Sequence, residues 1–83
     1  MRIIKKLNLE NPITVAPTYG EPITYVGMIV RRDVEWDEYV VNTVTDQGEQ
    51  KKSQTSYHTS DKDDALDTAQ MKLNAIVRLG EKA

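Results

Sequence analysis

The pattern of apolar and polar residues indicates two strong strands and one weaker strand in the middle of the chain. Segments 23–32 (ITYVGMIVRR) and 38–45 (EYVVNTVT) are rich in β-branched and aromatic residues, which favour strands. The residues DQGE at 46–49 predict a type I turn whose glycine takes positive φ, so a hairpin follows. The polar segment 50–58 lies between this turn and a helix start, and we assign it as a third, more exposed strand.

Residues 61–79 carry the pattern of an amphipathic helix. Ser60 or Asp61 is expected to cap its N-terminus, where further acidic residues interact favourably with the helix dipole. Gly80 is expected to be the residue that ends the helix. The apolar residues recur at spacings of three and four, at Leu66, Ala69, Leu73 and Ile76.

The first 22 residues hold all three prolines, at positions 12, 17 and 22. Proline lacks a backbone donor and breaks helices, so we expect an arm of loops and short extended runs. Two apolar runs flank Asn11-Pro12, and one of them is expected to lie along an edge of the sheet. We therefore divide the chain into an N-terminal arm, 1–22, and a single β-β-β-α domain, 23–83.

These elements predict an α+β fold. Its sheet is a three-stranded antiparallel meander, which an N-terminal strand would extend to four, and one C-terminal helix packs on it. Loops centred at 35/36 and 47/48 set the register. They place Val30 opposite Val41 and Gln54, and Ile29 opposite Asn42 and Ser53.

Both faces of this sheet are partly apolar. A single helix covers one face, so we expect the other to be covered by the arm, by a second copy of the chain or by a foreign partner. One face carries Val26, Met28, Val30, Tyr39 and Val41, and the other carries Tyr25, Ile29, Val40, Val44 and Tyr57.

The composition limits the classes of function. The chain has 83 residues, 39% of them hydrophobic, and no cysteine, which indicates one small domain without disulfides, thiolate ligands or a cysteine nucleophile. Absence of cysteine fits a reducing compartment, so we expect a cytoplasmic protein. No apolar stretch reaches the length of a membrane helix or a signal peptide, so no membrane partner is expected. Neither a metal site nor a cofactor is expected, because histidine is single and no phosphate-binding loop occurs.

The sole tryptophan lies among carboxylates near a predicted hairpin tip. An aromatic anchor inside an acidic rim is suited to a basic protein surface, because the aromatic ring supplies affinity and the charges steer association. Alternatively, the tryptophan folds back and closes the end of the core. The candidate partner-binding residues are Asp33, Glu35, Trp36, Asp37, Glu38 and Tyr39.

A second interpretation is a domain that contacts DNA or RNA through its basic residues. The net charge of −2, and the same value over 23–60, argue against a surface that grips phosphates. The candidate residues are Arg31, Arg32, Lys51 and Lys52 on the sheet, with Arg2, Lys5 and Lys6 on the arm.

A third interpretation is a small enzyme or enzyme subunit around His58, the only histidine, with Asp61 as its partner. A structural role for His58 is favoured, because no signature of a serine or cysteine nucleophile accompanies it.

The order of three strands and a helix, with Tyr57-His58-Thr59-Ser60 leading into Asp64-Ala65-Leu66, resembles the DNA-binding module of phage-integrase arms and plant AP2 factors. In outline it is also similar to small phage proteins that inhibit host enzymes. These likenesses rest on element order, so no functional residue is carried over. We expect a non-enzymatic protein-protein interaction module, a small regulator or inhibitor, whose partner is another protein or a second copy.

Overall fold

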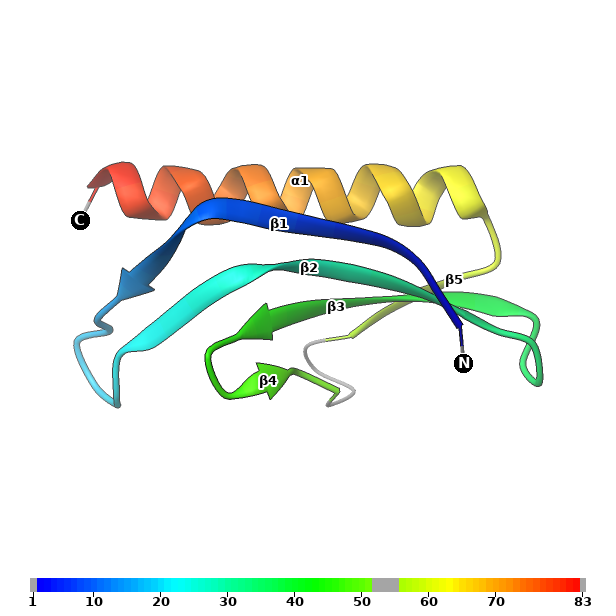
Figure 1. The fold of residues 1–83 in the computed structure, drawn as a ribbon, viewed down its shortest axis with the longest axis horizontal. Coiled ribbons are helices and arrows are strands. Elements are labelled where there is room, and N and C mark those ends of the chain that lie inside the picture. Colours follow the sequence, from blue (N-terminus) through cyan, green and yellow to red (C-terminus); the bar gives the residue numbers. More distant parts are fainter. Residues whose placement is uncertain (1, 52–55, 83) are drawn as a thin grey trace.

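A computed structural model describes residues 2–51 and 56–82, and it shows one helix packed across one face of an antiparallel sheet (Figure 1). The predicted α+β class is therefore confirmed, and the N-terminal strand is present. The strands lie in the order β1-β2-β3-β4, and β5 also pairs with β3. The elements are β1 (Arg2–Val15), β2 (Ile23–Asp33), β3 (Glu38–Thr45), β4 (Gly48–Glu49), β5 (Tyr57–Thr59) and α1 (Lys62–Lys82).

The hairpin of β2 and β3 has the predicted register. Val30 pairs with Val41 and Ile29 pairs with Asn42, so the connecting loop is centred between positions 35 and 36. Gly48 adopts a φ of 106°, the positive value that was predicted and that other residues rarely take. The turn itself lies one residue earlier than predicted, because Val44 pairs with Glu49 and Thr45 with Gly48, which centres the loop between positions 46 and 47.

The predicted third strand at 50–58 is wrong in its bounds and its register. Two short strands replace it, and Val41 pairs with Tyr57 where Gln54 was expected. Val44 pairs with Glu49 of β4, and Val41 pairs with Tyr57 of β5. Three positions on β3 therefore correspond to eight positions on the opposite side of the ladder. Gln54 and Ser53 lie outside the described residues.

The residues that were predicted to form an arm make the longest strand of the sheet. β1 pairs antiparallel with β2 from Arg2 to Val15, so both apolar runs of the arm belong to one edge strand. The register shifts between Asn8 and Ile13, and Pro12 lies within that shift. Proline is tolerated here because an edge strand at an irregularity does not need every backbone donor.

The helix begins where the acidic residues predict. Of the two expected caps, Asp61 is the one that acts, because its Oδ1 accepts hydrogen bonds from the backbone nitrogens of Asp63 (2.9 Å) and Asp64 (3.3 Å). The predicted end at Gly80 is wrong, since α1 continues to Lys82. Gly80 instead provides space for β1: a Cβ at this position would lie 2.8 Å from Cγ2 of Ile13.

The core lies between α1 and the sheet. The register of β2 against β3 shifts between Tyr25 and Gly27, and the predicted faces of two residues are therefore wrong. Tyr25, expected on the far face, packs against the core, and Val26, expected on the core face, lines a hollow with Ile29. Tyr57, which was also expected on the far face, packs against the core because β5 pairs it with Val41. The buried cluster consists of Met28, Val30, Val41, Ala65, Ala69 and Ile76.

The far face of the sheet is less apolar than expected. Ile29 and Val40 are only 5% and 3% exposed in the single chain. Of the three expected covers, the arm does not lie on this face, because β1 extends the sheet at its edge. Each of the two has a polar neighbour across the ladder, because Asn42 pairs with Ile29 and Arg31 pairs with Val40 in the register. A second copy or a foreign partner is therefore not required to bury them.

Hydrogen bonds between charged and polar side chains hold this far face together. Arg31 donates to Glu49 from Nε (2.9 Å to Oε1) and from Nη2 (2.8 Å to Oε2). Asn42 donates to the same carboxylate at 2.7 Å and accepts a hydrogen bond from Ser56. The hydrogen bonds from Arg31 lower the pKa of Glu49 from its ordinary value, against burial, which acts in the opposite direction.

Candidate partner-binding site

The loop between β2 and β3 forms a tip, residues 34–37, at the end of the molecule where β1 begins (Figure 1). Arg32 fastens the base of this tip. Its Nη1 donates to the backbone oxygens of Asp33 (3.2 Å) and Glu38 (3.1 Å), and its Nη2 forms an ion pair with Asp37. One guanidinium thus ties both strands of the hairpin and the loop together, which restricts the conformations of the tip.

Two large apolar side chains project from the tip. Trp36 is 72% exposed and Val34 is 77% exposed. The backbone nitrogen of Trp36 donates to Oδ1 of Asp33 at 3.3 Å, and Asp37 completes the turn with a φ of 50°. Of the two interpretations of Trp36, closure of the core is therefore wrong, and the exposed position is the one observed.

The other predicted partner-binding residues divide into two groups. Glu35 and Asp37 lie in the tip with Trp36, and Asp33 lies at its base as the last residue of β2, although Asp37 already pairs with Arg32. Glu38 and Tyr39 lie elsewhere. Oε1 of Glu38 is 2.8 Å from Nδ1 of His58, and Tyr39 packs against the helix-facing core with the Arg32 guanidinium 4.8 Å from its ring centre.

Sequence reasoning missed two residues that shape this tip. Val34 is the second exposed apolar side chain, and its position between Asp33 and Glu35 in a predicted loop was the available signal. Arg32 was considered only as a nucleic-acid contact. Its role in fastening the tip depends on three acceptors that the folded hairpin brings together, and no spacing in the sequence reveals that.

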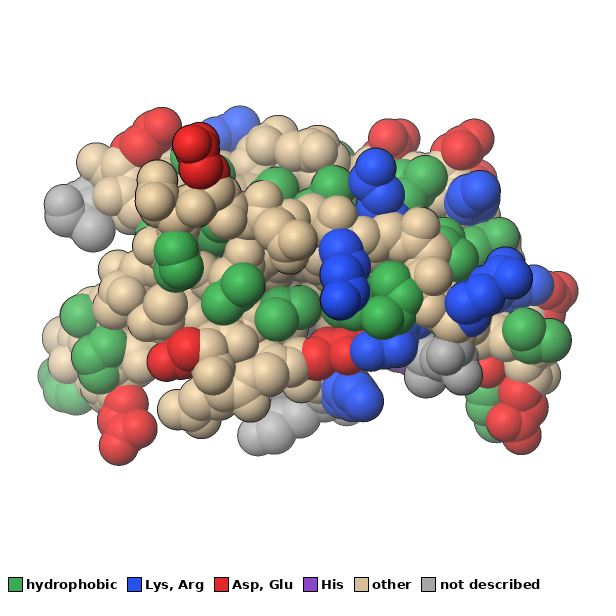
Figure 2. Space-filling model, in the orientation of Figure 1, with side chains coloured by type: hydrophobic (Ala, Val, Ile, Leu, Met, Phe, Trp, Pro, Cys, Tyr) green, Lys and Arg blue, Asp and Glu red, His purple; other side chains and the backbone are tan. Residues whose placement is uncertain are grey.

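The basic residues proposed to contact nucleic acid do not all lie on one free surface. Arg31 and Arg32 are engaged by the carboxylates of Glu49 and Asp37. The register of β1 places Arg2 opposite Arg32, and Figure 2 shows Lys and Arg side chains gathered over the half of the molecule that contains the start of β1. Of the remaining candidates, Lys5 and Lys6 lie on β1, Lys51 lines a hollow with Arg31 and His58, and Lys52 lies outside the described residues.

His58 and Asp61 do not form the pair considered for an enzyme. Asp61 caps α1, and His58 contacts Glu38, so the imidazole and its carboxylate partner sit on neighbouring strands. Within residues 2–51 and 56–82, no three His, Asp or Glu side chains are placed to hold one metal ion.

Comparisons with protein-family models, with curated proteins and with solved structures find no significant match for this chain. In the part of the chain that the structure describes, no helix combines the length and the apolar character needed to cross a bilayer.

Proposed function

We propose that this protein is a non-enzymatic protein-binding module, and that it acts as a small regulator or inhibitor by inserting the tip into its partner. The exposure of Trp36 and Val34 on a fastened hairpin tip is the observation that carries this proposal. Exposing two such side chains to water is unfavourable, and their burial against a partner recovers that free energy. Because Arg32 restricts the loop beforehand, binding costs less conformational entropy.

The charges around the tip define the chemistry of the partner. Asp33, Glu35 and Asp37 are the carboxylates next to Trp36 in the hairpin, and among the described residues Arg32 is the cation paired with this group. A complementary surface offers an apolar pocket for the indole ring with basic groups at its rim. Tryptophan in such a pocket is a frequent hot spot, and the rim charges mainly increase the rate of association.

The alternative functions have less support. Nucleic-acid binding would have to proceed without Arg31 and Arg32, since carboxylates already engage both. An enzyme around His58 would need a nucleophile or bound group, and the contact to Glu38 gives the ring a structural partner instead.

Replacement of Trp36 by alanine is expected to weaken binding of the partner at least about thirtyfold, the effect typical of a hot-spot residue. The protein, immobilised through a C-terminal tag, would first capture its partner from an extract of the native host. Affinity of the purified partner for each variant would then be measured by titration calorimetry. Val34→Ala is expected to give a smaller loss.

Tyr19→Ala is the matched control, because Tyr19 is an aromatic residue that is 92% exposed but lies in the loop between β1 and β2. This variant should bind as the wild type does. Equal binding by Trp36→Ala and the wild type would contradict the proposed role of the tip.

A further inference from the structure

The outer edge of β1 is available for pairing with another strand. β1 spans 14 residues and pairs with β2 alone among the described strands. In Figure 1, α1 runs along β1, and β2 lies on the other side of β1 from α1 in this view. The backbone N–H and C=O groups on the outer side of such a strand can form a second ladder.

The charges of β1 are separated along its length. Arg2, Lys5 and Lys6 occupy the first half, and Glu10 occupies the second half. All four residues are exposed, and none of them forms an ion pair with another described residue. One half of the edge is therefore basic and the other half is acidic.

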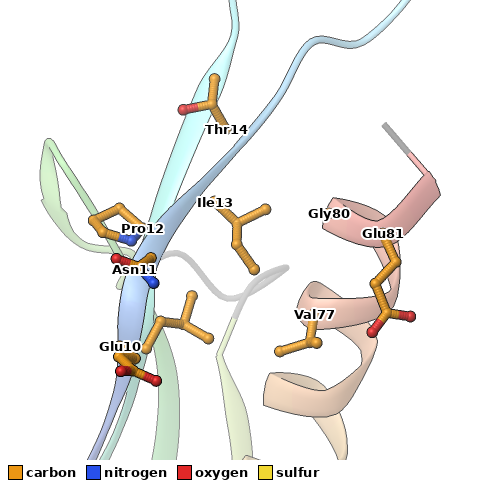
Figure 3. A pocket seen from close by; sticks show the side chains of 9 residues that line it. Glu10, Asn11, Pro12, Ile13, Thr14, Val77, Gly80 and Glu81 are labelled. Carbon is orange, nitrogen blue, oxygen red and sulfur yellow. The ribbon is translucent and has the colours of Figure 1, made fainter.

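A hollow at the second half of β1 adds a second carboxylate to the acidic half of the edge. It has a volume of about 500 Å³ and lies between the irregular part of β1 and the last turns of α1 (Figure 3). Leu9, Ile13 and Val77 supply its apolar lining, and Glu10 and Glu81 add two carboxylates. The negative charge at this end thus comes from both β1 and α1.

We propose that two copies of the chain pair antiparallel along β1, about a two-fold axis at Asn8. This arrangement brings Lys6 of each copy to Glu10 of the other, and Leu7 to Leu9, where β1 enters the segment that is irregular toward β2. The antiparallel direction brings the basic half of each strand onto the acidic half of its partner, and the two-fold axis repeats that contact.

A second copy fits this edge better than an unrelated extended peptide. An acidic peptide would meet Glu10 and Glu81, and a basic peptide would meet Arg2 and Lys5, so either one is repelled along half of its length. A reversed copy of β1 matches both halves. Pairing ends near Pro12, which lies opposite Ile4 and cannot donate to the new ladder.

The dimer joins two sheets edge to edge and places both α1 helices on the same side of the combined sheet. The tips lie beyond the paired segment of β1, so the dimer does not require the proposed function of Trp36.

Charge reversal at two positions tests this pairing. In sedimentation equilibrium at concentrations up to about 1 mM, the wild type should form a dimer, and Lys6→Glu or Glu10→Lys should each weaken it about tenfold or more. In each variant, both contacts of the dimer become repulsive. An equimolar mixture of the two variants should form a heterodimer, because a glutamate at position 6 then meets a lysine at position 10, and the native Lys6 meets the native Glu10.

Circular dichroism would show that each variant keeps its fold, and Trp36→Ala should dimerise as the wild type does. A wild type that stays monomeric would overturn the proposal, and the lysines of β1 would then serve to prevent edge pairing. Single variants that dimerise normally, or a mixture without heterodimer, would overturn it as well.

Discussion

Replacement of Gly27 by alanine is expected to destabilise the fold by about 3 kcal/mol, the upper end of the usual cost of overpacking. A Cβ at this position would lie 2.1 Å from the backbone oxygen of Leu7 and 3.0 Å from Cα of Asn8. Both atoms belong to the main chain of β1, so no side-chain rotation relieves the clash. β1 and β2 would have to separate at the point where each of them already changes register.

Urea unfolding, followed by far-ultraviolet circular dichroism, would measure this loss. Asn8→Ala is the matched control, because Asn8 pairs with Gly27 and has an exposed side chain. Its effect should stay within about 0.5 kcal/mol. If Gly27→Ala were as stable as this control, the close approach of β1 to β2 would be disproved.

Replacement of Arg31 by methionine is expected to cost about 3 kcal/mol, because it leaves the Glu49 carboxylate without its cation in a mostly buried position. The side chain of Glu49 is only 10% exposed. The double variant Arg31→Met/Glu49→Gln should recover most of this loss, since the neutral amide needs no cation and its oxygen still accepts the hydrogen bond from Asn42. Chemical unfolding of both variants would measure the two values. A double variant as unstable as Arg31→Met would contradict this account.

The same ion pair predicts how stability depends on pH. In the folded state the pKa of Glu49 is lowered from its ordinary value of about 4.5. Its ionised form therefore stabilises the fold above pH 4.5, and this contribution is lost as the pH falls through the lower pKa of the folded state. Glu49→Gln should lose stability less steeply than the wild type over that acidic range.

The sequence was sufficient for the elements whose signals are local. The β-branched residues of β2 and β3 and a symmetric loop predict their register, and the acidic residues after Ser60 predict the start of α1. Two misjudged positions have non-local causes. The register of β2 against β3 shifts at Val26, next to the position where the backbone of β1 approaches Gly27, and α1 continues through Gly80 where Ile13 of β1 approaches it.

The candidate site shows the same division. A predicted hairpin loop placed Trp36 at a tip among acidic residues, but the sequence left two interpretations of its ring. The ring is exposed, and Arg32, whose acceptors lie on both strands of the hairpin, fastens the loop that carries it. Glu38 and Tyr39 were assigned to the site because they are close in sequence, yet alternation along β3 directs their side chains to opposite faces.

Fluorescence of the single tryptophan tests most directly whether Trp36 is exposed in the free protein and becomes buried when the partner binds. Because Trp36 is 72% exposed, its emission should resemble that of tryptophan in water, and acrylamide should quench it readily. Addition of the purified partner should shift the emission to shorter wavelength and protect the ring from acrylamide. A ring that is already protected in the free protein, or that stays fully accessible in the complex, would contradict the account.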